Sequence, residues 1–217
     1  MIILFGSHKG GVGKTTLIAN LAVMLQKKTA SVAIVRADKN RDLEVWAEFR
    51  SEKDVPDIPV MTCYGDISKD IRKLETVTDV VFVDTAGHDS MELRSALTVA
   101  DIFLTPVKPS SLLEIATLDG LSSIVREAQK KNSSLQGFTL FNRCPTSSFN
   151  NDAQDLAKYL KANPEMLPPL RSCVSDLRPY EKAVNQGLGV HEVRAKNVSK
   201  AKGQLELLFT EIQIKID

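Results

Sequence analysis

Short runs of consecutive apolar residues alternate along the chain with segments in which apolar residues recur every three or four positions. The runs are typical of strands buried on both faces, and the wider spacing is typical of helices that pack by one side. The pattern predicts strands at residues 2–5, 31–35, 60–63, 80–83, 102–105 and 138–141, with another near residue 173. It predicts helices at residues 15–26, 43–49, 67–74, 91–99, 112–128, 153–160, 180–184 and 200–212.

This alternation predicts the fold class. Parallel strands need long crossover connections, so alternating strands and helices indicate an α/β protein with a doubly wound, mostly parallel sheet flanked by helices on both faces. The 217 residues are enough for one substantial core, and we expect residues 1–217 to form a single domain. Ligands bind such sheets at the carboxyl ends of the strands, which is where candidate chemistry is expected.

Composition narrows the class of protein further. The chain is 43% apolar and 25% charged with a net charge of +1, so it carries no global polybasic field. Cys63, Cys144 and Cys173 are far apart and odd in number, which predicts reduced thiols rather than a zinc site or a disulfide framework. The apolar start is too short for a signal peptide, and no run approaches the roughly 20 residues of a membrane span. We therefore expect a cytoplasmic protein.

A glycine-rich segment, KGGVGKTT at residues 9–16, joins the first predicted strand to the first predicted helix. Its glycines let the main chain approach a phosphate, and successive backbone N–H groups can cradle the anion at the helix N-terminus. Lys14 would reach the β- and γ-phosphates, and the Thr15 hydroxyl would bind Mg²⁺. His8 stands where the strict motif has glycine, but the strand–loop–helix context favours a phosphate loop over a glycine-rich turn beside a surface lysine. The predicted nucleotide contacts are Gly10, Gly11, Val12, Gly13, Lys14, Thr15 and Thr16.

A carboxylate follows the most strand-like run of the chain. Residues 80–83 are all apolar and Asp84 comes directly after them. An aspartate at the tip of a buried strand is the usual second ligand of a phosphate-bound Mg²⁺, commonly through water. Asp84 is therefore predicted to act with Thr15 at the metal.

The segment from Lys9 to Thr15 resembles the deviant Walker A motif of the ParA/MinD family of ATPases. The resemblance implies a P-loop NTPase fold, the cofactors ATP and Mg²⁺, and a homodimer that closes on ATP. It also implies that Lys9 reaches the partner subunit's ATP, where a cation supplied in trans stabilises the transferring phosphoryl group. The alternative for Lys9 is an ordinary solvated lysine.

Two further segments correspond to motifs of the family, and the one at residues 36–40 departs from the family's usual sequence. Residues 84–87, DTAG, resemble the family's switch II. Residues 36–40, RADKN, stand where the family usually has D-x-D-P-Q, so Asp38 matches the catalytic aspartate that positions the attacking water, and Arg36 replaces the first aspartate. The replacement implies unusually slow or regulated hydrolysis. Asp38 is equally suited to a helix N-cap or a turn, and that alternative stays open.

The resemblance also suggests where the base binds. Residues 101–110 match the family's strand and following loop, and the strand after them ends at Asn142 and Arg143. In relatives the residues that end this strand contact adenine, and an asparagine can pair with a base edge. The alternative for Asn142 is a turn-forming asparagine.

The last third of the chain resembles small plasmid-partition ATPases that lack an N-terminal helix-turn-helix domain. Residues 171–203 hold seven basic and three acidic residues, a net charge of +4 against +1 for the whole chain. The resemblance implies non-specific DNA binding by this surface, although a solvated surface is the plainer interpretation. The candidate DNA contacts are Arg178, Lys196, Lys200 and Lys202. A membrane-binding helix at residues 205–216 is disfavoured because Lys215 is its one basic residue.

The sequence thus predicts a partition ATPase. Its ATP-bound dimer would bind nucleoid DNA in a bacterial cytoplasm, and a ParB-like centromere-binding adaptor protein would stimulate hydrolysis and release it. The alternatives are a positioning ATPase for a protein cargo, a MinD-like membrane switch, a metabolic P-loop ligase or kinase, and a scaffold that binds ATP without hydrolysing it.

Overall fold

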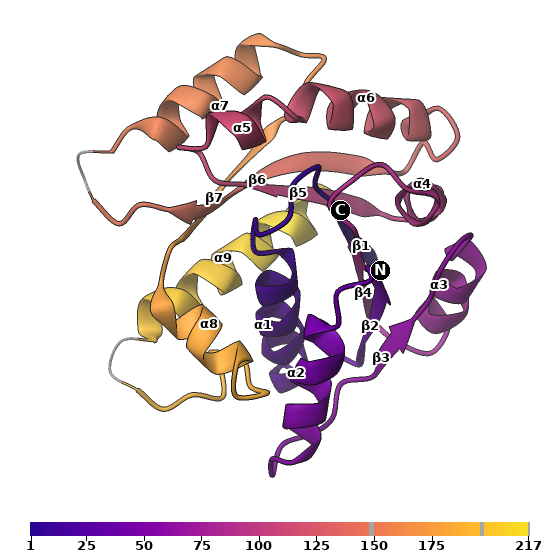
Figure 1. The fold of residues 1–217 in the computed structure, drawn as a ribbon, viewed down its shortest axis with the longest axis vertical. Helices are drawn as coiled ribbons and strands as arrows, with labels where there is room; N and C mark the ends of the chain where they lie inside the picture. Colours follow the sequence, from indigo (N-terminus) through magenta and orange to yellow (C-terminus); the bar gives the residue numbers. More distant parts are fainter. Residues whose placement is uncertain (148–149, 196–197, 217) are drawn as a thin grey trace.

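The computed structural model describes residues 1–147, 150–195 and 198–216. Its strands form one seven-stranded sheet in the order β3-β2-β4-β1-β5-β6-β7, and every neighbouring pair is parallel (Figure 1). The strands are β1 (Ile2–Phe5), β2 (Val32–Ala37), β3 (Val60–Thr62), β4 (Val80–Thr85), β5 (Ile102–Val107), β6 (Gln136–Cys144) and β7 (Pro169–Ser175).

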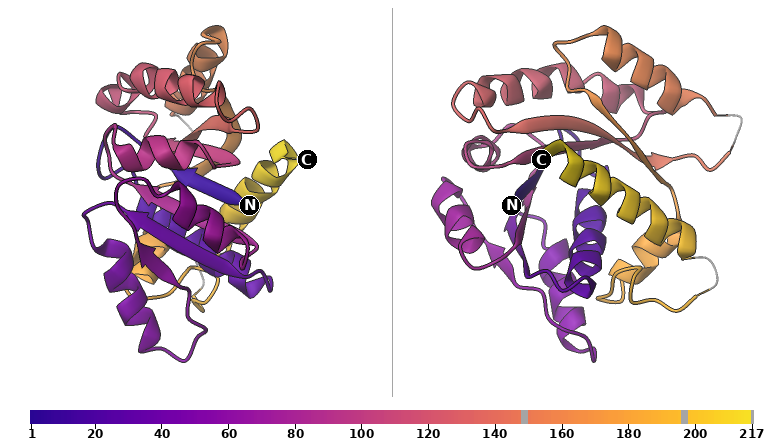
Figure 2. Two further views of the ribbon diagram at one scale, coloured as in Figure 1. Left: turned by 90° about the vertical axis from the view of Figure 1, so that its right-hand side faces the viewer. Right: turned by 180° about the vertical axis from the view of Figure 1, so that it is seen from behind.

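Helices cover both faces of the sheet (Figure 2). One face is covered by α1, α2, α8 and α9, and the other by α3, α4 and α6, with α7 beside the β6–β7 side. The helices are α1 (Lys14–Lys27), α2 (Asp42–Ser51), α3 (Ser68–Glu75), α4 (Met91–Leu97), α5 (Leu112–Ile115), α6 (Leu118–Gln129), α7 (Asp152–Ala162), α8 (Arg178–Val184) and α9 (Ser199–Ile216). The fold class predicted from the alternating pattern is confirmed, and the sheet is parallel throughout.

The inner strands are buried on both faces because helices lie on both sides of them. Every residue of β1, β2, β4 and β5 is buried. The register places Phe5 of β1 opposite Asp84, and Arg36 of β2 opposite the same Asp84 on the other side of β4. The carboxyl ends of these three strands therefore lie side by side, and the segments that follow them share one edge of the sheet.

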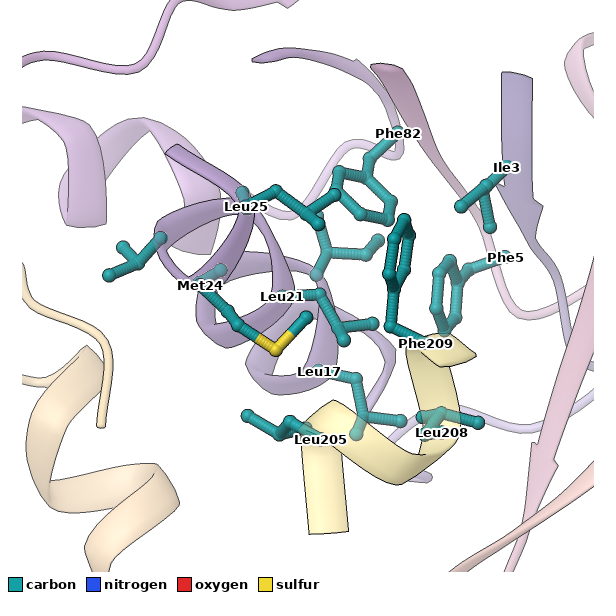
Figure 3. Close-up of a cluster of buried hydrophobic side chains, with 14 of the residues drawn as sticks. Ile3, Phe5, Leu17, Leu21, Met24, Leu25, Phe82, Leu205, Leu208 and Phe209 are labelled. Carbon is teal, nitrogen blue, oxygen red and sulfur yellow. The ribbon is translucent and has the colours of Figure 1, made fainter. Parts of the chain in front are cut away.

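Helix α1 lies in the largest part of the core. Leu17, Leu21 and Leu25 face the sheet, and Phe209 of α9 points toward Phe5 and Phe82 (Figure 3). Buried apolar area of this kind stabilises a fold by about 25 cal/mol per Å². The first turn of α1 carries the phosphate loop, so this packing holds the loop to the centre of the sheet.

Helix α9 is a packing helix, as its sequence predicted. Leu205, Leu208, Phe209 and Ile212 are buried in the same core as α1. No helix in the described ranges is long and apolar enough to cross a membrane.

The prediction of one continuous helix at residues 112–128 is wrong. The chain forms a single exposed turn, α5, and starts α6 only at Leu118. The Thr117 hydroxyl donates to the Glu114 carbonyl oxygen at 2.7 Å, which ends the first turn with a local hydrogen bond. Leu112 and Leu113 are 81% and 73% exposed, whereas Leu121 of α6 packs into the core. Apolar spacing alone did not show that Leu112 and Leu113 would remain exposed.

Candidate nucleotide-binding site

The phosphate loop leaves β1 at Phe5 and enters α1 at Lys14. Gly13, at the N-cap of α1, has φ 90°, a left-handed value that a side chain would strain. A Cβ at this position would also lie 2.6 Å from Asn142 Nδ2. Gly13 has no side chain that could cap α1, so the first backbone N–H groups of the helix remain available to an anion.

The Lys14 side chain is held beneath the loop. Its Nζ donates to Ser7 Oγ at 2.9 Å, and the Ser7 hydroxyl donates to the Lys9 carbonyl oxygen at 2.7 Å. Lys14 is 7% exposed and Ser7 is 3% exposed. Sequence reasoning identified Lys14 but missed Ser7, because its importance depends on a contact formed only when the loop folds back over β1.

Thr15 and Asp84, the two residues predicted to bind Mg²⁺, meet at the end of β4, and metal binding by them stays a prediction. The Thr15 hydroxyl donates to Asp84 Oδ2 at 2.9 Å. Asp84 Oδ1 is buried and has no hydrogen-bond partner within the described parts of the chain. Burial raises the pKa of this carboxyl to about 6, against the lowering effect of the Lys14 charge and the Thr15 hydroxyl, and Asp38 and Asp42 raise it further. A buried carboxylate oxygen with no donor is a suitable ligand for a hydrated cation.

The segment after β4 lies directly against the phosphate loop. A Cβ on Gly87 would stand 2.9 Å from the Lys9 carbonyl carbon and 3.0 Å from the Gly10 nitrogen. Only glycine permits so close an approach between the two backbones. Residues 84–87 are thus in contact with the loop at Lys9 and Gly10, and their role as a switch stays a prediction.

The segment after β2 forms the side of the site next to Asp84. Asp38, Asn40 and Asp42 line the same cavity as the phosphate loop. The Asp38 carboxylate accepts a hydrogen bond from the Asn40 backbone N–H at 3.1 Å. This is the turn role that the sequence left open for Asp38, and the residue also faces the cavity where a catalytic aspartate would act. Asp42 was not predicted from the sequence.

Asn142 and Arg143 fasten the far side of the phosphate loop. Asn142 Nδ2 donates to the Val12 carbonyl oxygen at 2.7 Å, and Arg143 Nη1 donates to the Gly11 carbonyl oxygen at 3.0 Å. Arg143 has φ 53°, so its backbone adopts a left-handed conformation at the end of β6. Both residues line the cavity. Their contacts in this structure position the loop, and contact with adenine stays a prediction.

These elements enclose a cavity of about 510 Å³, a size that suits a nucleotide. Its outer wall comes from the end of β7 and the start of α8, including Ser175, Asp176, Tyr180 and Glu181. Sequence reasoning missed this wall, because residues so far along the chain from the loop give no local sign of reaching it.

The candidate DNA contacts do not all lie together. Arg178 lines the nucleotide cavity, whereas Lys200 and Lys202 belong to the first turn of α9. Lys200 is exposed, and Lys202 Nζ donates to the Val193 carbonyl oxygen at 3.4 Å. Lys196 lies outside the described residues. Arg178 is therefore within reach of a bound nucleotide, and contact with DNA stays a prediction for all four residues.

Lys9 differs from Lys14 in its surroundings. Its side chain is exposed at the rim of the loop, and its ammonium has no hydrogen bond or ion pair to any residue that the structure describes. The two lysines are close together in the sequence, yet one points under the loop and the other toward solvent.

A second hollow of about 670 Å³ lies beside α4 and α6. Met91, Arg94 and Ile124 are among its lining residues, and no part of the phosphate loop reaches it. It lacks a glycine-rich backbone that could hold phosphate, so the chemistry is assigned to the cavity above α1.

A parallel sheet with a glycine-rich loop, a buried lysine and a Thr–Asp pair at its carboxyl edge defines a P-loop nucleotide-binding protein. The model of the CobQ/CobB/MinD/ParA nucleotide-binding domain family matches residues 3–184, and the chain belongs to that family. It is an ATPase of the ParA/MinD group.

Solved structures share the fold across nearly the whole chain. Apo McdA from Cyanothece has a TM-score of 0.70 at 16% identity, with 96% of this chain and 98% of that chain covered. MinD from Pyrococcus horikoshii, complexed with Mg-ADP, has a TM-score of 0.69 at 19% identity, covering 99% and 98%. A candidate plasmid partition protein from Borrelia burgdorferi bound to AMPPNP has a TM-score of 0.68 at 18% identity, covering 97% and 98%. No curated protein sequence matches the chain significantly.

Proposed function

We propose that this ATPase is a DNA-partition or DNA-positioning switch that dimerises on ATP, binds non-specific DNA as a dimer and releases it after adaptor-stimulated hydrolysis. The observation that carries the proposal is the exposed Lys9 at the rim of a site in which Lys14 and Asp84 are both buried. An unpaired ammonium beside a phosphate site is suited to a phosphate that its own subunit does not hold.

The site supports binding of a magnesium nucleotide. The phosphate-loop backbone and Lys14 would hold the phosphates, and Thr15 with Asp84 would hold Mg²⁺. Bound Mg²⁺ neutralises charge that develops on the phosphoryl oxygens. Asp38 would orient the attacking water from the wall formed after β2, and Asn142 and Arg143 would hold the loop beside the base.

Dimerisation would link ATP binding to DNA binding. Closure of two subunits over ATP would bring each Lys9 to the partner's phosphates, so the ATP state and the dimer depend on each other. Each subunit offers a small basic surface at the start of α9, and pairing two such surfaces raises the avidity for DNA steeply.

The test is binding to a non-specific DNA duplex with ATP, with ADP and without nucleotide, at low and at moderate salt. We expect ATP-dependent, salt-sensitive binding by the wild type and its loss in Lys9→Ala. Lys27→Ala is the matched control, because it removes an exposed lysine at the opposite end of α1. Binding that ignores nucleotide would contradict the switch. ATP-dependent dimers that bind no DNA at either salt concentration would overturn the DNA role and favour a protein cargo.

A further inference from the structure

Arg36 is a buried charged residue at the end of β2. It is 4% exposed, and every nitrogen of its guanidinium is used. Nε and Nη2 donate to Thr62 Oγ1 at 3.2 and 2.8 Å, and Nη2 also donates to Glu44 Oε1 at 2.6 Å. Nη1 donates to the carbonyl oxygens of Asp38 and Asn40 at 2.5 and 3.0 Å.

These contacts connect three parts of the chain. Glu44 lies in the first turn of α2, Thr62 ends β3, and Asp38 and Asn40 belong to the segment that lines the nucleotide cavity. Glu44 neutralises the guanidinium, and the Thr62 hydroxyl in turn donates to Glu44 Oε1 at 2.9 Å. The pair is thereby satisfied without help from any phosphate.

An ion pair between Arg36 and Glu44 would not need the two hydrogen bonds from Arg36 to backbone carbonyl oxygens. A buried ion pair is weak support for stability, since desolvation offsets much of the attraction. Two backbone carbonyls held by one planar nitrogen fix the path of the chain between them, and that path carries Asp38. Lysine offers a single point charge and cannot satisfy the same four acceptors.

We propose that Arg36 is a positioning residue, which holds the segment 38–40 so that the Asp38 carboxylate faces the phosphate end of the cavity. The inference rests on the proposed hydrolysis at this site and adds a residue that acts only through Asp38. The guanidinium itself is not among the groups that line the cavity.

The test compares Arg36→Lys with Arg41→Ala. Arg41 pairs with the same Glu44, at 2.7 Å, but its side chain is 67% exposed and it contacts neither carbonyl. For Arg36→Lys we expect single-turnover ATP hydrolysis to slow on the order of 10- to 100-fold, because a displaced catalytic group costs about that much. The affinity for ATP is expected to change little, and Arg41→Ala is expected to match the wild type in both measurements.

Two further measurements separate positioning from general damage. In an Asp38→Asn background, Arg36→Lys should slow hydrolysis no further, since both substitutions remove the same contribution. Hydrogen exchange of a peptide spanning residues 38–42 should speed up in Arg36→Lys while exchange in β1 and β4 stays unchanged.

The outcomes are distinct. Wild-type hydrolysis by Arg36→Lys, or slowing that adds fully to that of Asp38→Asn, would overturn the positioning role. If the wild-type protein binds ATP but never hydrolyses it, the proposed function fails instead. The positioning of residues 38–40 by Arg36 is then tested by hydrogen exchange alone, and unchanged hydrogen exchange at residues 38–42 would refute it.

Discussion

Asp84 shows how a single residue can be unfavourable in the fold and useful in the site. It is 3% exposed, and one of its oxygens accepts the Thr15 hydroxyl while the other has no partner among the described residues. Burial penalises the charged form, which is the form that a cation needs. A bound cation would therefore offset the unfavourable free energy of burying the charged Asp84 carboxylate.

This arrangement predicts how the nucleotide-free and metal-free protein responds to pH. The pKa of Asp84 rises from 3.8 to about 6 on folding, so the folded state binds more protons across that interval and stability falls as pH rises through it. The full effect is roughly 3 kcal/mol, at about 1.4 kcal/mol per pKa unit. We expect Asp84→Asn to be more stable than the wild type near pH 8 and to lose that advantage near pH 4.

Urea denaturation across this pH range checks the prediction, and Asp79 supplies a control of opposite sign. Hydrogen bonds from the Ser31 side chain and backbone lower the pKa of the exposed Asp79 carboxyl. Its contribution is present above the unfolded pKa and is lost as pH falls, so Asp79→Asn should be less stable than the wild type at high pH. An Asp84→Asn variant that is destabilised equally at all pH values would contradict the assignment.

At the scale of elements, the buried Arg50 joins α2 to the segment between α8 and α9, and Trp46 Nε1 adds a hydrogen bond to the Leu188 carbonyl oxygen at 3.2 Å. Arg50 donates to Glu192 Oε1 and Oε2 at 2.8 and 2.9 Å and to the Gly187 carbonyl oxygen at 3.2 Å. The side chains of this pair are 1% and 5% exposed. The guanidinium carbon also lies 5.5 Å from the centroid of the Trp46 ring. Helix α2 directly follows the segment that bears Asp38. The Arg50–Glu192 pair, by fixing α2, therefore also helps to hold that segment beside the nucleotide cavity.

Arg50→Ala should therefore destabilise the protein strongly, by about 3–5 kcal/mol, since the Glu192 carboxylate would remain buried without its counter-charge and would keep only the hydrogen bond from the Gly189 backbone N–H. Arg50→Met combined with Glu192→Leu should recover much of that loss, because no unpaired charge then remains. Chemical denaturation of the three proteins measures the difference. Arg72→Ala is the control: Arg72 pairs with Glu75 but is 51% exposed, and its loss should cost about 1 kcal/mol or less. Equal effects of Arg50→Ala and Arg72→Ala would contradict the buried-pair account.

At the scale of the whole molecule, the nucleotide cavity and the start of α9 are separate surfaces. Helix α9 packs against α1, whose first turn belongs to the phosphate loop, and Tyr180 of the cavity wall donates from its hydroxyl to the Ala201 carbonyl oxygen at 2.9 Å. The lysines at the start of α9 are thus connected to the nucleotide site through packed elements. Substitutions at one surface can be made without touching the other.

The double substitution Lys200→Ala/Lys202→Ala is expected to weaken binding of the ATP-bound dimer to non-specific DNA. The slope of log affinity against log salt should fall by about 0.9 for each DNA phosphate that the variant no longer neutralises. Dimerisation with a non-hydrolysable ATP analogue, followed by sedimentation, should be unchanged. Lys130→Ala/Lys158→Ala removes two exposed lysines, one at the end of α6 and one in α7, and should leave both measurements as in the wild type. An unchanged salt slope in the first variant would exclude this part of α9 from the DNA surface.

The sequence by itself determined the α/β class and indicated which polar residues would gather at one edge of the sheet. Alternation of apolar runs with helical spacing reflects burial on two faces of a parallel sheet, and it is local enough to be read directly. Lys14, Thr15 and Asp84 were identified because a phosphate loop and a strand-tip aspartate each have a short, recognisable pattern. Their meeting at one edge followed from the rule that parallel strands end together.

Only the tertiary structure decided what the remaining polar groups do. Ser7 contacts Lys14, Asn142 holds Val12, and the wall at residues 174–181 closes the cavity through contacts between segments far apart in the chain. The break between α5 and α6 was likewise not predicted, because apolar spacing shows which residues can be buried but not which of them the fold buries. Arg36 could be seen in the sequence as a departure from the family pattern. Its hydrogen bonds to the Asp38 and Asn40 carbonyl oxygens, however, depend on contacts with Glu44 of α2 and Thr62 of β3. Local patterns fix which elements form, whereas the partners of buried polar groups are set by long-range packing.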